Sequence, residues 1–283
     1  MSWLNSTDWY KGNPNYMTFE EAAAVTSDQF KGTNNAQKKA IVTFDEAKYF
    51  TSVTDLNGAF THCTLLESIT IPDSVTRIGG YAFEYCSSLT NITIPDNVTS
   101  IGTFAFYGCT SLALTSLPNG ITSMGDYAFG GCTSLALTSL PSNLTTIEYS
   151  TFGNCKSLAL TSLPSGITSI GKSAFSGCTS LTLTSLPSGI TNIGEKAFLN
   201  CHALKDTLYE IPSSVMEIGE YAFGFIEFSA LKFLGLNSPT FGNRSIYATP
   251  QKVDCQVPLA SLADYQDKMR TLTDAELITI STY

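Results

Sequence analysis

The residues best suited to chemistry in this 283-residue sequence are its eight cysteines. Seven of them recur at intervals of 23 residues, at Cys63, Cys86, Cys109, Cys132, Cys155, Cys178 and Cys201, and Cys255 lies apart from them. A zinc site needs ligands in close pairs such as C-x₂₋₄-C, and this spacing provides none. A nucleophilic thiol needs a base beside it. The only two histidines, His62 and His202, lie six repeat intervals apart and cannot share one site.

The spacing of the cysteines instead indicates a structural role. If consecutive 23-residue units stack in parallel, neighbouring cysteines lie about 5 Å apart, within the Cα range of a disulfide. Their Cβ atoms then point the same way instead of toward each other. We therefore expect a ladder of buried thiols that behave as small hydrophobic groups, with disulfides as the alternative and a metal site less favoured than either. Cys255 is also expected to be buried.

The carboxylates and glycines give no catalytic pattern either. Between residues 117 and 189 the charged side chains are Asp126, Glu148, Lys156 and Lys172, and none pairs with another at one repeat position in adjacent units. A glycosidase-like acid pair is therefore not visible. The segments "GGYAF" and "FGGC" lack the Lys and Ser/Thr of a phosphate-binding loop. We predict that the protein is not an enzyme and has no catalytic, cofactor-binding or metal-ligating residues.

Composition narrows the classes of partner. The formal net charge is −9, and the only arginines, Arg77, Arg244 and Arg270, are far apart in sequence. Nucleic acid is therefore not an expected partner, because its phosphates require clustered Lys and Arg. No apolar run reaches the roughly 18 residues that a membrane span needs, so we predict no membrane-spanning segment. The start "MSWLNSTDWYKG" has no basic or apolar leader pattern, so if the protein is exported its signal peptide was removed before Met1.

The whole 23-residue unit repeats, and it predicts the fold. Phenylalanines precede the cysteines by three residues from Phe60 to Phe198, and prolines follow nine residues after them from Pro72 to Pro187; the pattern restarts at Pro212 and Phe223. "ITIP" and "VTRI" alternate apolar and polar residues, which predicts short strands, and "GxxAFxxC" fits one helical turn. One such unit cannot bury its apolar side chains alone, but stacked units can. The sequence therefore predicts a right-handed β/α solenoid of about eight turns with short parallel strands.

The two ends differ from the repeats and predict caps. "MTFEEAAAV" has Thr18 and Glu21 as a capping box, and Thr43 with Glu46 suggests a second helix start before "AKYF". "VPLASLADYQDKM" predicts a strand and then a helix from about residue 260. We expect a helical N-terminal cap at 1–52, a solenoid at 53–235 and a small C-terminal cap at 236–283. Within the solenoid, "LALTSL" at 112–117 replaces the "LTNITI" of 89–94, which predicts a local change of register, for example through a bulge.

These repeats resemble the BspA-like leucine-rich repeats, a family of bacterial and protist surface proteins. The matching pattern is "SLTNITIPDNVTSIGTFAFYGC" at 88–109, and it recurs through residue 223; the flanks "AIVTFDEAKYF" and "CQVPLASLADYQDKM" resemble those of family members as well. The leader of such relatives often contains a calcium-binding loop, but "STDWYKGNPNYMTFEE" lacks the alternating acidic residues that this loop requires, so no cofactor is expected. The resemblance implies a secreted or cell-surface protein that binds other macromolecules, and it implies no chemistry.

Two candidate binding surfaces follow from the repeat positions that vary. One position holds Tyr81, Phe104, Tyr127 and Tyr221, an aromatic stripe suited to docking a protein or stacking on sugars, unless the rings only cover the turns or pack on each other. The second surface is the strand face with Asn91 and Thr93. We expect an adhesin-like protein that recognises host or microbial surface proteins or glycans at the cell surface. The alternative is a structural spacer that presents another module.

Overall fold

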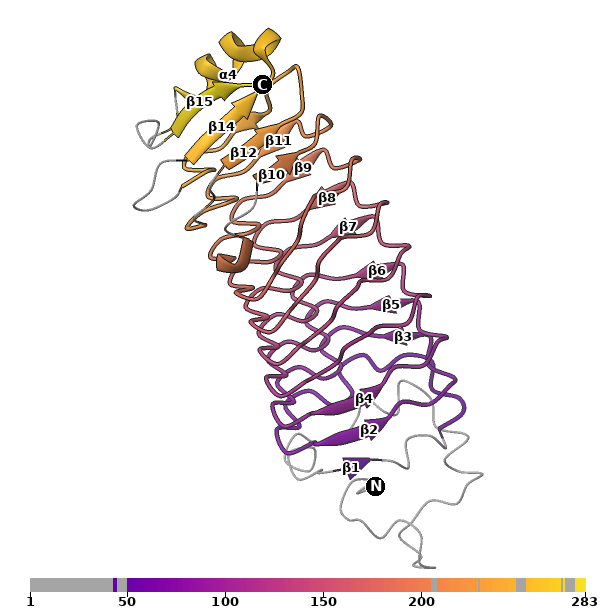
Figure 1. The fold of residues 1–283 in the computed structure, drawn as a ribbon. Helices are drawn as coiled ribbons and strands as arrows, with labels where there is room; N and C mark the ends of the chain where they lie inside the picture. The colour runs from indigo at the N-terminus through magenta and orange to yellow at the C-terminus, as the bar shows by residue number, and fades with distance from the viewer. Residues whose placement is uncertain are drawn as a thin grey trace, which may run out of the picture.

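The computed structural model of the chain describes residues 43–44, 50–204, 208–226, 228, 230–247, 253–270, 272 and 278–283. In this part of the chain, successive repeats form the turns of an elongated solenoid whose strands lie in rows along its length (Figure 1). The expected solenoid of short parallel strands is therefore confirmed. The predicted N-terminal helix "MTFEEAAAV" lies outside the described residues.

Each repeat contributes very short strands. The elements are β1 (Thr43–Phe44), β2 (Ser68–Thr70), β3 (Arg77–Ile78), β4 (Asn91–Thr93), β5 (Ser100–Ile101), β6 (Ser123–Met124), β7 (Thr146–Ile147), β8 (Ser169–Ile170), β9 (Asn192–Ile193), η2 (His202–Leu204), β10 (Leu208–Ile211), β11 (Glu217–Ile218), β12 (Ala230–Phe233), β13 (Thr240–Phe241), β14 (Val253–Val257), η3 (Leu259–Ser261), α4 (Leu262–Met269) and β15 (Ile278–Thr282). Thr43, which the sequence suggested as a helix cap, is in strand β1 and pairs with Ser68 of β2.

The strands form four parallel sheets. Their orders are β1-β2-β4, β3-β5-β6, β13-β11-β9-β8-β7 and β10-β12-β14-β15. Equivalent residues pair between turns, as in Ile78 with Ile101 and Ile170 with Ile193. This register places the same apolar position of every unit at the same depth, so that a period of 23 residues produces a continuous core.

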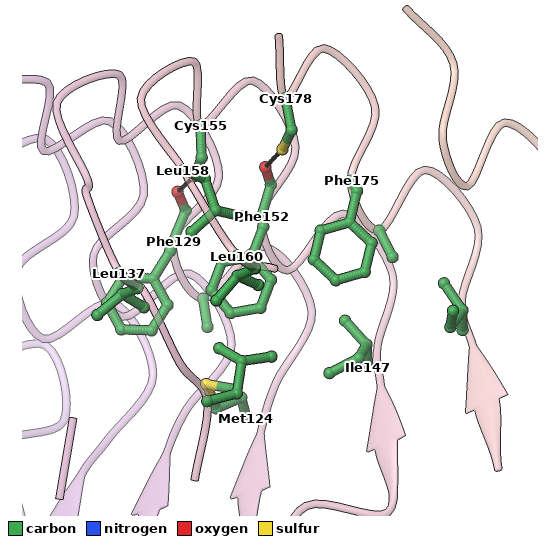
Figure 2. Packing of buried hydrophobic residues seen from close by; sticks show 14 of the residues in the cluster. Met124, Phe129, Leu137, Ile147, Phe152, Cys155, Leu158, Leu160, Phe175 and Cys178 are labelled. Carbon is green, nitrogen blue, oxygen red and sulfur yellow. Dashed lines mark hydrogen bonds between the residues drawn. The ribbon is translucent and has the colours of Figure 1, made fainter. Parts of the chain in front are cut away.

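The core is built from columns of identical side chains. The rings of eight phenylalanines, Phe60, Phe83, Phe106, Phe129, Phe152, Phe175, Phe198 and Phe223, are buried and stack with neighbouring centroids 5.1–5.7 Å apart and nearly parallel planes. Offset stacking of this kind adds about 0.5–1.5 kcal/mol per pair beyond the burial of apolar area. The cysteine column lies beside it, as Figure 2 shows for Cys155 and Cys178. All eight cysteines are buried and free, as the ladder of thiols predicted.

The segment "GxxAFxxC" does not form the expected helical turn. The N–H groups of Tyr81, Phe83 and Tyr85 donate to carbonyls of the following turn, those of Thr103, Ala105 and Tyr107, at 2.7–3.0 Å. In a helix they would donate to residues of their own segment. Tyr81 and Tyr85 also have φ values of 58° and 57°, in the left-handed region that ends a helix. Hydrogen bonds between turns therefore replace those of a helix.

The "LALTSL" segments change the buried positions and carry no strand in the described residues. In the strand-forming unit the buried residues are Leu89, Ile92 and Ile94, whereas Leu158, Leu160 and Leu163 are buried in a later unit. The second apolar residue has moved one position earlier, so the alternation that β4 requires is lost. The predicted change of register is real, and it ends the β1-β2-β4 sheet instead of forming a bulge within it.

A second interruption lies between β6 and β7, which belong to different sheets. The residue after the paired apolar position is glycine in most units, and an added Cβ at Gly125 or Gly171 would lie within 3.0 Å of backbone atoms of the preceding turn. Glu148 occupies this position in the β7 unit. Its Cβ requires the two turns to separate, which accounts for the lost pairing. The N–H of Tyr149 is satisfied instead by the Asp126 carboxylate at 3.1 Å.

The C-terminal strand and helix agree with the sequence pattern. Strand β14 pairs with β12 and β15, and α4 follows it after the single turn of η3. The buried side chain of Tyr265 on α4 donates from its hydroxyl to the Gly235 carbonyl at 3.1 Å. The helix is thereby fastened to the end of the solenoid, where Figure 1 shows it beside the last strands.

Candidate binding surface

The predicted aromatic stripe is partly present. The rings of Tyr81 and Phe104 stack with centroids 5.4 Å apart, and those of Phe104 and Tyr127 stack at 4.7 Å. Tyr81 is 47% exposed, while Phe104 and Tyr127 are half-buried. The rings therefore do pack on each other, as one alternative had it, and they also remain at the surface.

Three further tyrosines, which the sequence did not single out, join these rings. Tyr85, Tyr107 and Tyr149 make edge-to-face contacts with one another or with the stacked rings, at centroid distances of 4.7–5.8 Å. We call the set of Tyr81, Tyr85, Phe104, Tyr107, Tyr127 and Tyr149 the N-terminal aromatic cluster. Aligning the residue before each cysteine would have revealed Tyr85, because it occupies the same repeat position as His62.

Backbone geometry makes room for the cluster. Tyr81, Phe104 and Tyr127 all have φ between 55° and 58°. Phenylalanine and tyrosine rarely adopt this region, and such strain persists only where surrounding contacts impose it. A Cβ on Gly108 would lie 2.7 Å from the Tyr85 ring, so this ring needs a glycine beneath it. The surface thus depends on several specific residues as well as on the fold.

Carboxylates accompany the rings. The N–H of Glu84 donates to the Tyr81 carbonyl at 3.4 Å, which places Glu84 in the same turn as that ring. Glu84 also lies 3.9 Å from Nδ1 of His62, whose ring contacts Tyr85. Desolvation, the neighbouring Tyr107 and the Glu84 charge together raise the pKa of Tyr85. The cluster is therefore aromatic and acidic.

Tyr221, the fourth predicted stripe residue, belongs to a separate group. Its ring contacts Phe225 and Tyr247, with centroids 6.4 and 5.9 Å apart. The Arg244 guanidinium lies 5.7 Å from the centroids of both Tyr221 and Tyr247, and it donates to the Tyr221 hydroxyl. We call Tyr221, Phe225, Tyr247 and Arg244 the C-terminal cluster. Arg244 was not assigned to a binding surface from the sequence, although it follows Tyr221 by one repeat.

The stripe position is polar between the two clusters. It is occupied by Ser150, Ser173 and Lys196, all with positive φ. Lys172 and Lys196 both pair with Glu195, each at 2.7 Å, and their hydrogen bonds lower the pKa of that carboxyl. Exposed pairs of this kind stabilise little. Because these polar residues stand between the N-terminal aromatic cluster and the C-terminal cluster, the aromatic surface is divided into two parts.

The second predicted surface is on another sheet. Asn91 and Thr93 are exposed on β4, which pairs with β2, whereas the turns with Tyr81 and Phe104 follow β3 and β5. On the neighbouring sheets, threonine hydroxyls donate to carbonyls of the preceding turn, as Thr99 does to Thr76 and Thr122 to Thr99, both at 3.3 Å. These hydroxyls serve the fold and are only partly available to a ligand.

The thiols are held in an unreactive state. Each of six cysteines donates its S–H to the carbonyl of the phenylalanine 26 residues earlier, for example Cys155 to Phe129 at 3.1 Å and Cys178 to Phe152 at 3.0 Å (Figure 2). Burial raises the pKa of both thiols well above the ordinary value. A reactive thiol requires the opposite shift. These cysteines therefore have a structural role and are not suited to act as nucleophiles.

The described residues contain neither a cluster of metal ligands nor a helix suited to a bilayer. No group of three or more His, Cys, Asp and Glu side chains in that part of the chain could hold a metal ion. None of the helices there combines the length and apolar character that crossing a bilayer requires. The stretch "STDWYKGNPNYMTFEE", in which no calcium-binding loop is expected, lies outside the described residues.

Several solved bacterial proteins are similar to this chain. A leucine-rich repeat protein of T. pallidum is 32% identical, with 46% of this chain and 62% of that one covered and a TM-score of 0.42. A leucine-rich cell surface protein of Faecalibacterium prausnitzii is 25% identical, with 82% and 64% covered and a TM-score of 0.42. A leucine-rich repeat protein of Bacteroides ovatus is 21% identical, with 82% and 88% covered and a TM-score of 0.34. This chain thus spans less than two thirds of the first two proteins.

The family comparison covers most of the repeats. No curated protein matches the sequence. The model of the BspA type leucine-rich repeat region matches in six copies, over residues 56–182 and 145–251, which is more than half of the chain. These residues include both aromatic clusters and the columns of phenylalanine and cysteine. The chain therefore belongs to the family of BspA-type leucine-rich repeat proteins.

Proposed function

We propose that this protein is a non-enzymatic binding protein of the bacterial cell surface that recognises host or microbial surface proteins or glycans. The observation that carries the proposal is the N-terminal aromatic cluster, which places six neighbouring rings, three of them more than a third exposed, on one edge of the solenoid. Membership of the BspA-type family supports a role in binding at the cell surface. Exposed aromatic patches of this kind are enriched at interaction sites.

The cluster is a better candidate than the strand face with Asn91 and Thr93. Tyrosines supply large contact areas with little loss of rotamer entropy, and each adds a hydroxyl for hydrogen bonding. The positive φ of this repeat position is shared by Ser150, Ser173 and Lys196, so what distinguishes the cluster is the aromatic rings that occupy the position in three consecutive units.

A spacer is the second candidate, and the threonine columns favour it. The hydroxyls of Thr168 and Thr191 donate to the turn before them at 3.3 and 3.2 Å. Such ladders stiffen the stack and leave a neutral surface with little to attract a partner. A solenoid that only separates two modules would need these columns and would not need exposed aromatic rings.

The test is an array of host matrix proteins, bacterial surface proteins and glycans probed with four forms of the protein. These are the wild type, the Tyr81/Phe104/Tyr127 triple alanine variant, the milder Tyr81→Ala/Tyr85→Ala variant and an Asn91→Ala/Thr93→Ala control. We expect ligands that bind the wild type and the control but lose at least about tenfold in affinity with both aromatic variants. Binding that survives both aromatic variants would rule out the cluster, and no binding by any form would favour the spacer.

A further inference from the structure

The N-terminal aromatic cluster has carboxylates around it, and no lysine or arginine of the described residues lies over its rings. Arg77 lies on β3, four residues before Tyr81, and His62 lies beside Tyr85 and Glu84. Between residues 78 and 155 the only charged side chains are Glu84, Asp96, Asp126 and Glu148. Glu84 lies in the turn of Tyr81, and Asp126 precedes Tyr127 and accepts from the N–H of Tyr149. The chain as a whole carries a net charge of −9. A partner would therefore meet rings and negative charge together.

The C-terminal cluster shows how the same solenoid position accommodates a cation. Arg244 has a φ of 53° and follows Tyr221, with a φ of 52°, by one repeat in the same column. Its guanidinium packs on the two tyrosine rings and donates to a tyrosine hydroxyl. Planar guanidinium groups stack on tyrosine faces in this way because the ring quadrupole attracts positive charge. In this cluster the chain supplies its own cation.

We infer that the N-terminal aromatic cluster binds an arginine- or lysine-bearing polypeptide segment of a partner protein. Its cationic side chains pack on the exposed tyrosine rings and pair with Glu84 and Asp126. The inference rests on the proposed function and names the chemistry of the partner: a basic segment at a site where no lysine or arginine of the described residues packs on the rings.

The arrangement of the rings favours such a segment over a glycan. A sugar stacks on the flat face of a ring, but both faces of Phe104 are covered by Tyr81 and Tyr127. Among the described residues, the Tyr81 ring contacts only the Phe104 ring of the following unit, and the equivalent residue of the preceding unit is Gly58, which has no ring. Exposed single tyrosines with ring edges and hydroxyls around them suit a cationic side chain better than a run of sugars.

The experiment uses fluorescent peptides of about twelve residues that contain three arginines, and matched peptides with citrulline in their place. Citrulline keeps the planar shape and hydrogen-bonding groups of arginine but has no charge. We expect the arginine peptide to bind at least about tenfold more tightly by anisotropy, and the difference to shrink as NaCl rises from 50 to 300 mM. Equal affinity for the two peptides, or no binding of the arginine peptide, would overturn the inference.

Variants locate the site. Tyr81→Leu/Tyr85→Leu keeps apolar bulk without aromatic rings and should weaken the arginine peptide about 5- to 30-fold, whereas Tyr81→Phe/Tyr85→Phe should restore most of the affinity. Glu84→Gln/Asp126→Asn should remove most of the salt dependence. The Asn91→Ala/Thr93→Ala control should bind like the wild type. An unchanged affinity in the leucine variant, with the near-UV circular dichroism of a folded protein, would contradict the inference.

The two proposals fail separately. A glycan or a neutral protein that binds through the cluster, with no preference for the arginine peptide, would retain the proposed function and overturn the inference about charge. If the wild type binds neither the arginine peptide nor any ligand of the array, both proposals are overturned. An arginine peptide that binds equally well to the aromatic variants would show that the acidic surface acts without the rings, which also contradicts the inference.

Discussion

At the scale of single residues, cysteine is suited to its column for two physical reasons. Its side chain is small and apolar enough for a position that is fully buried, as in Cys132 and Cys178. Its S–H is also a weak donor that reaches the second lone pair of a carbonyl in the previous turn. Alanine would lose this contact, and serine would place a more polar group in the core.

The first prediction concerns the pH dependence that these thiols impose. Because burial raises the folded pKa of Cys132, Cys155 and Cys178, the folded state retains protons that the unfolded state releases above about pH 8.5. Stability is therefore complete below that pH and decreases as the pH rises. Between pH 8.5 and 9.5, the free energy of unfolding from urea titrations should acquire a slope approaching about 1.4 kcal/mol per pH unit for each thiol.

Cys155→Ala is the matched variant for this prediction. It removes one buried thiol, so the alkaline slope should decrease by the contribution of one group, while stability at pH 7 decreases by about 1 kcal/mol through the small cavity. A thiol reagent should detect no cysteine in the described core of the folded protein. A flat dependence of stability between pH 8 and 9.5, or rapid labelling without denaturant, would contradict the ladder.

The second prediction concerns Gly108, which supports the aromatic cluster. Its φ is +71°, and a Cβ there would lie 2.7 Å from Cδ1 of Tyr85. Gly108→Ala should therefore destabilise the protein by about 1–2 kcal/mol and displace the Tyr85 ring, which near-UV circular dichroism would detect. Gly189→Ala is the control, because the nearest atom to its Cβ is 3.9 Å away and its φ is not in the left-handed range. It should change stability by at most about 1 kcal/mol; equal costs for the two variants would contradict the geometry.

At the scale of elements, the strand ladder depends on a glycine beside each pair of strands. Gly171 follows β8 and Gly194 follows β9, where an added Cβ would lie 2.7–2.8 Å from backbone of the preceding turn. The same position is Glu148 after β7, and the ladder is interrupted there. One side chain thus divides one continuous sheet into two.

The third prediction is that Glu148→Gly joins β6 to β7. Without the Cβ, the N–H of residue 148 can donate to the Met124 carbonyl, as the N–H of Gly171 donates to the Ile147 carbonyl at 2.7 Å. Amide hydrogen exchange of residues 145–149 should slow by about tenfold, and the free energy of unfolding should rise by about 0.5–1.5 kcal/mol. Gly171→Glu should have the opposite effect between β7 and β8. Unchanged exchange in the glycine variant would show that another residue causes the interruption.

At the scale of the whole molecule, the solenoid is a stack in which each turn contacts only its neighbours. Phe152, for example, stacks on Phe129 on one side and on Phe175 on the other. Stability is then close to a sum of unit and interface terms. For folding, it matters more that equivalent residues of neighbouring units stay aligned than how many units the solenoid has.

The fourth prediction follows from this phase. Deletion of residues 156–178, one complete 23-residue unit, joins Cys155 to Thr179 and leaves every column intact. The shortened protein should fold with one cooperative transition at a moderately lower temperature, and its length from small-angle X-ray scattering should decrease by about 4.8 Å. Deletion of residues 156–167 places apolar and polar positions out of phase and should prevent folding. Similar behaviour of the two deletions would contradict the stacked architecture.

The sequence alone determined the period, the parallel stack and the buried columns of phenylalanine and cysteine. A fixed repeat places equivalent residues in equivalent environments, so Cys178 could be assigned to the core from its position in the series. The predicted limits of the two caps, at residues 52 and 236, stay predictions.

Only the tertiary structure decided how neighbouring turns meet. Tyr81 and Tyr85 take up left-handed conformations because their N–H groups bond to the next turn, and no local propensity predicts this for tyrosine. The grouping of Tyr85, Tyr107 and Tyr149 with the stripe, and of Arg244 with Tyr221, arises from contacts between residues in different or neighbouring turns. Periodicity specifies which residues are equivalent, whereas the direction of each surface side chain depends on the backbone hydrogen bonds and the neighbours that the fold places around it.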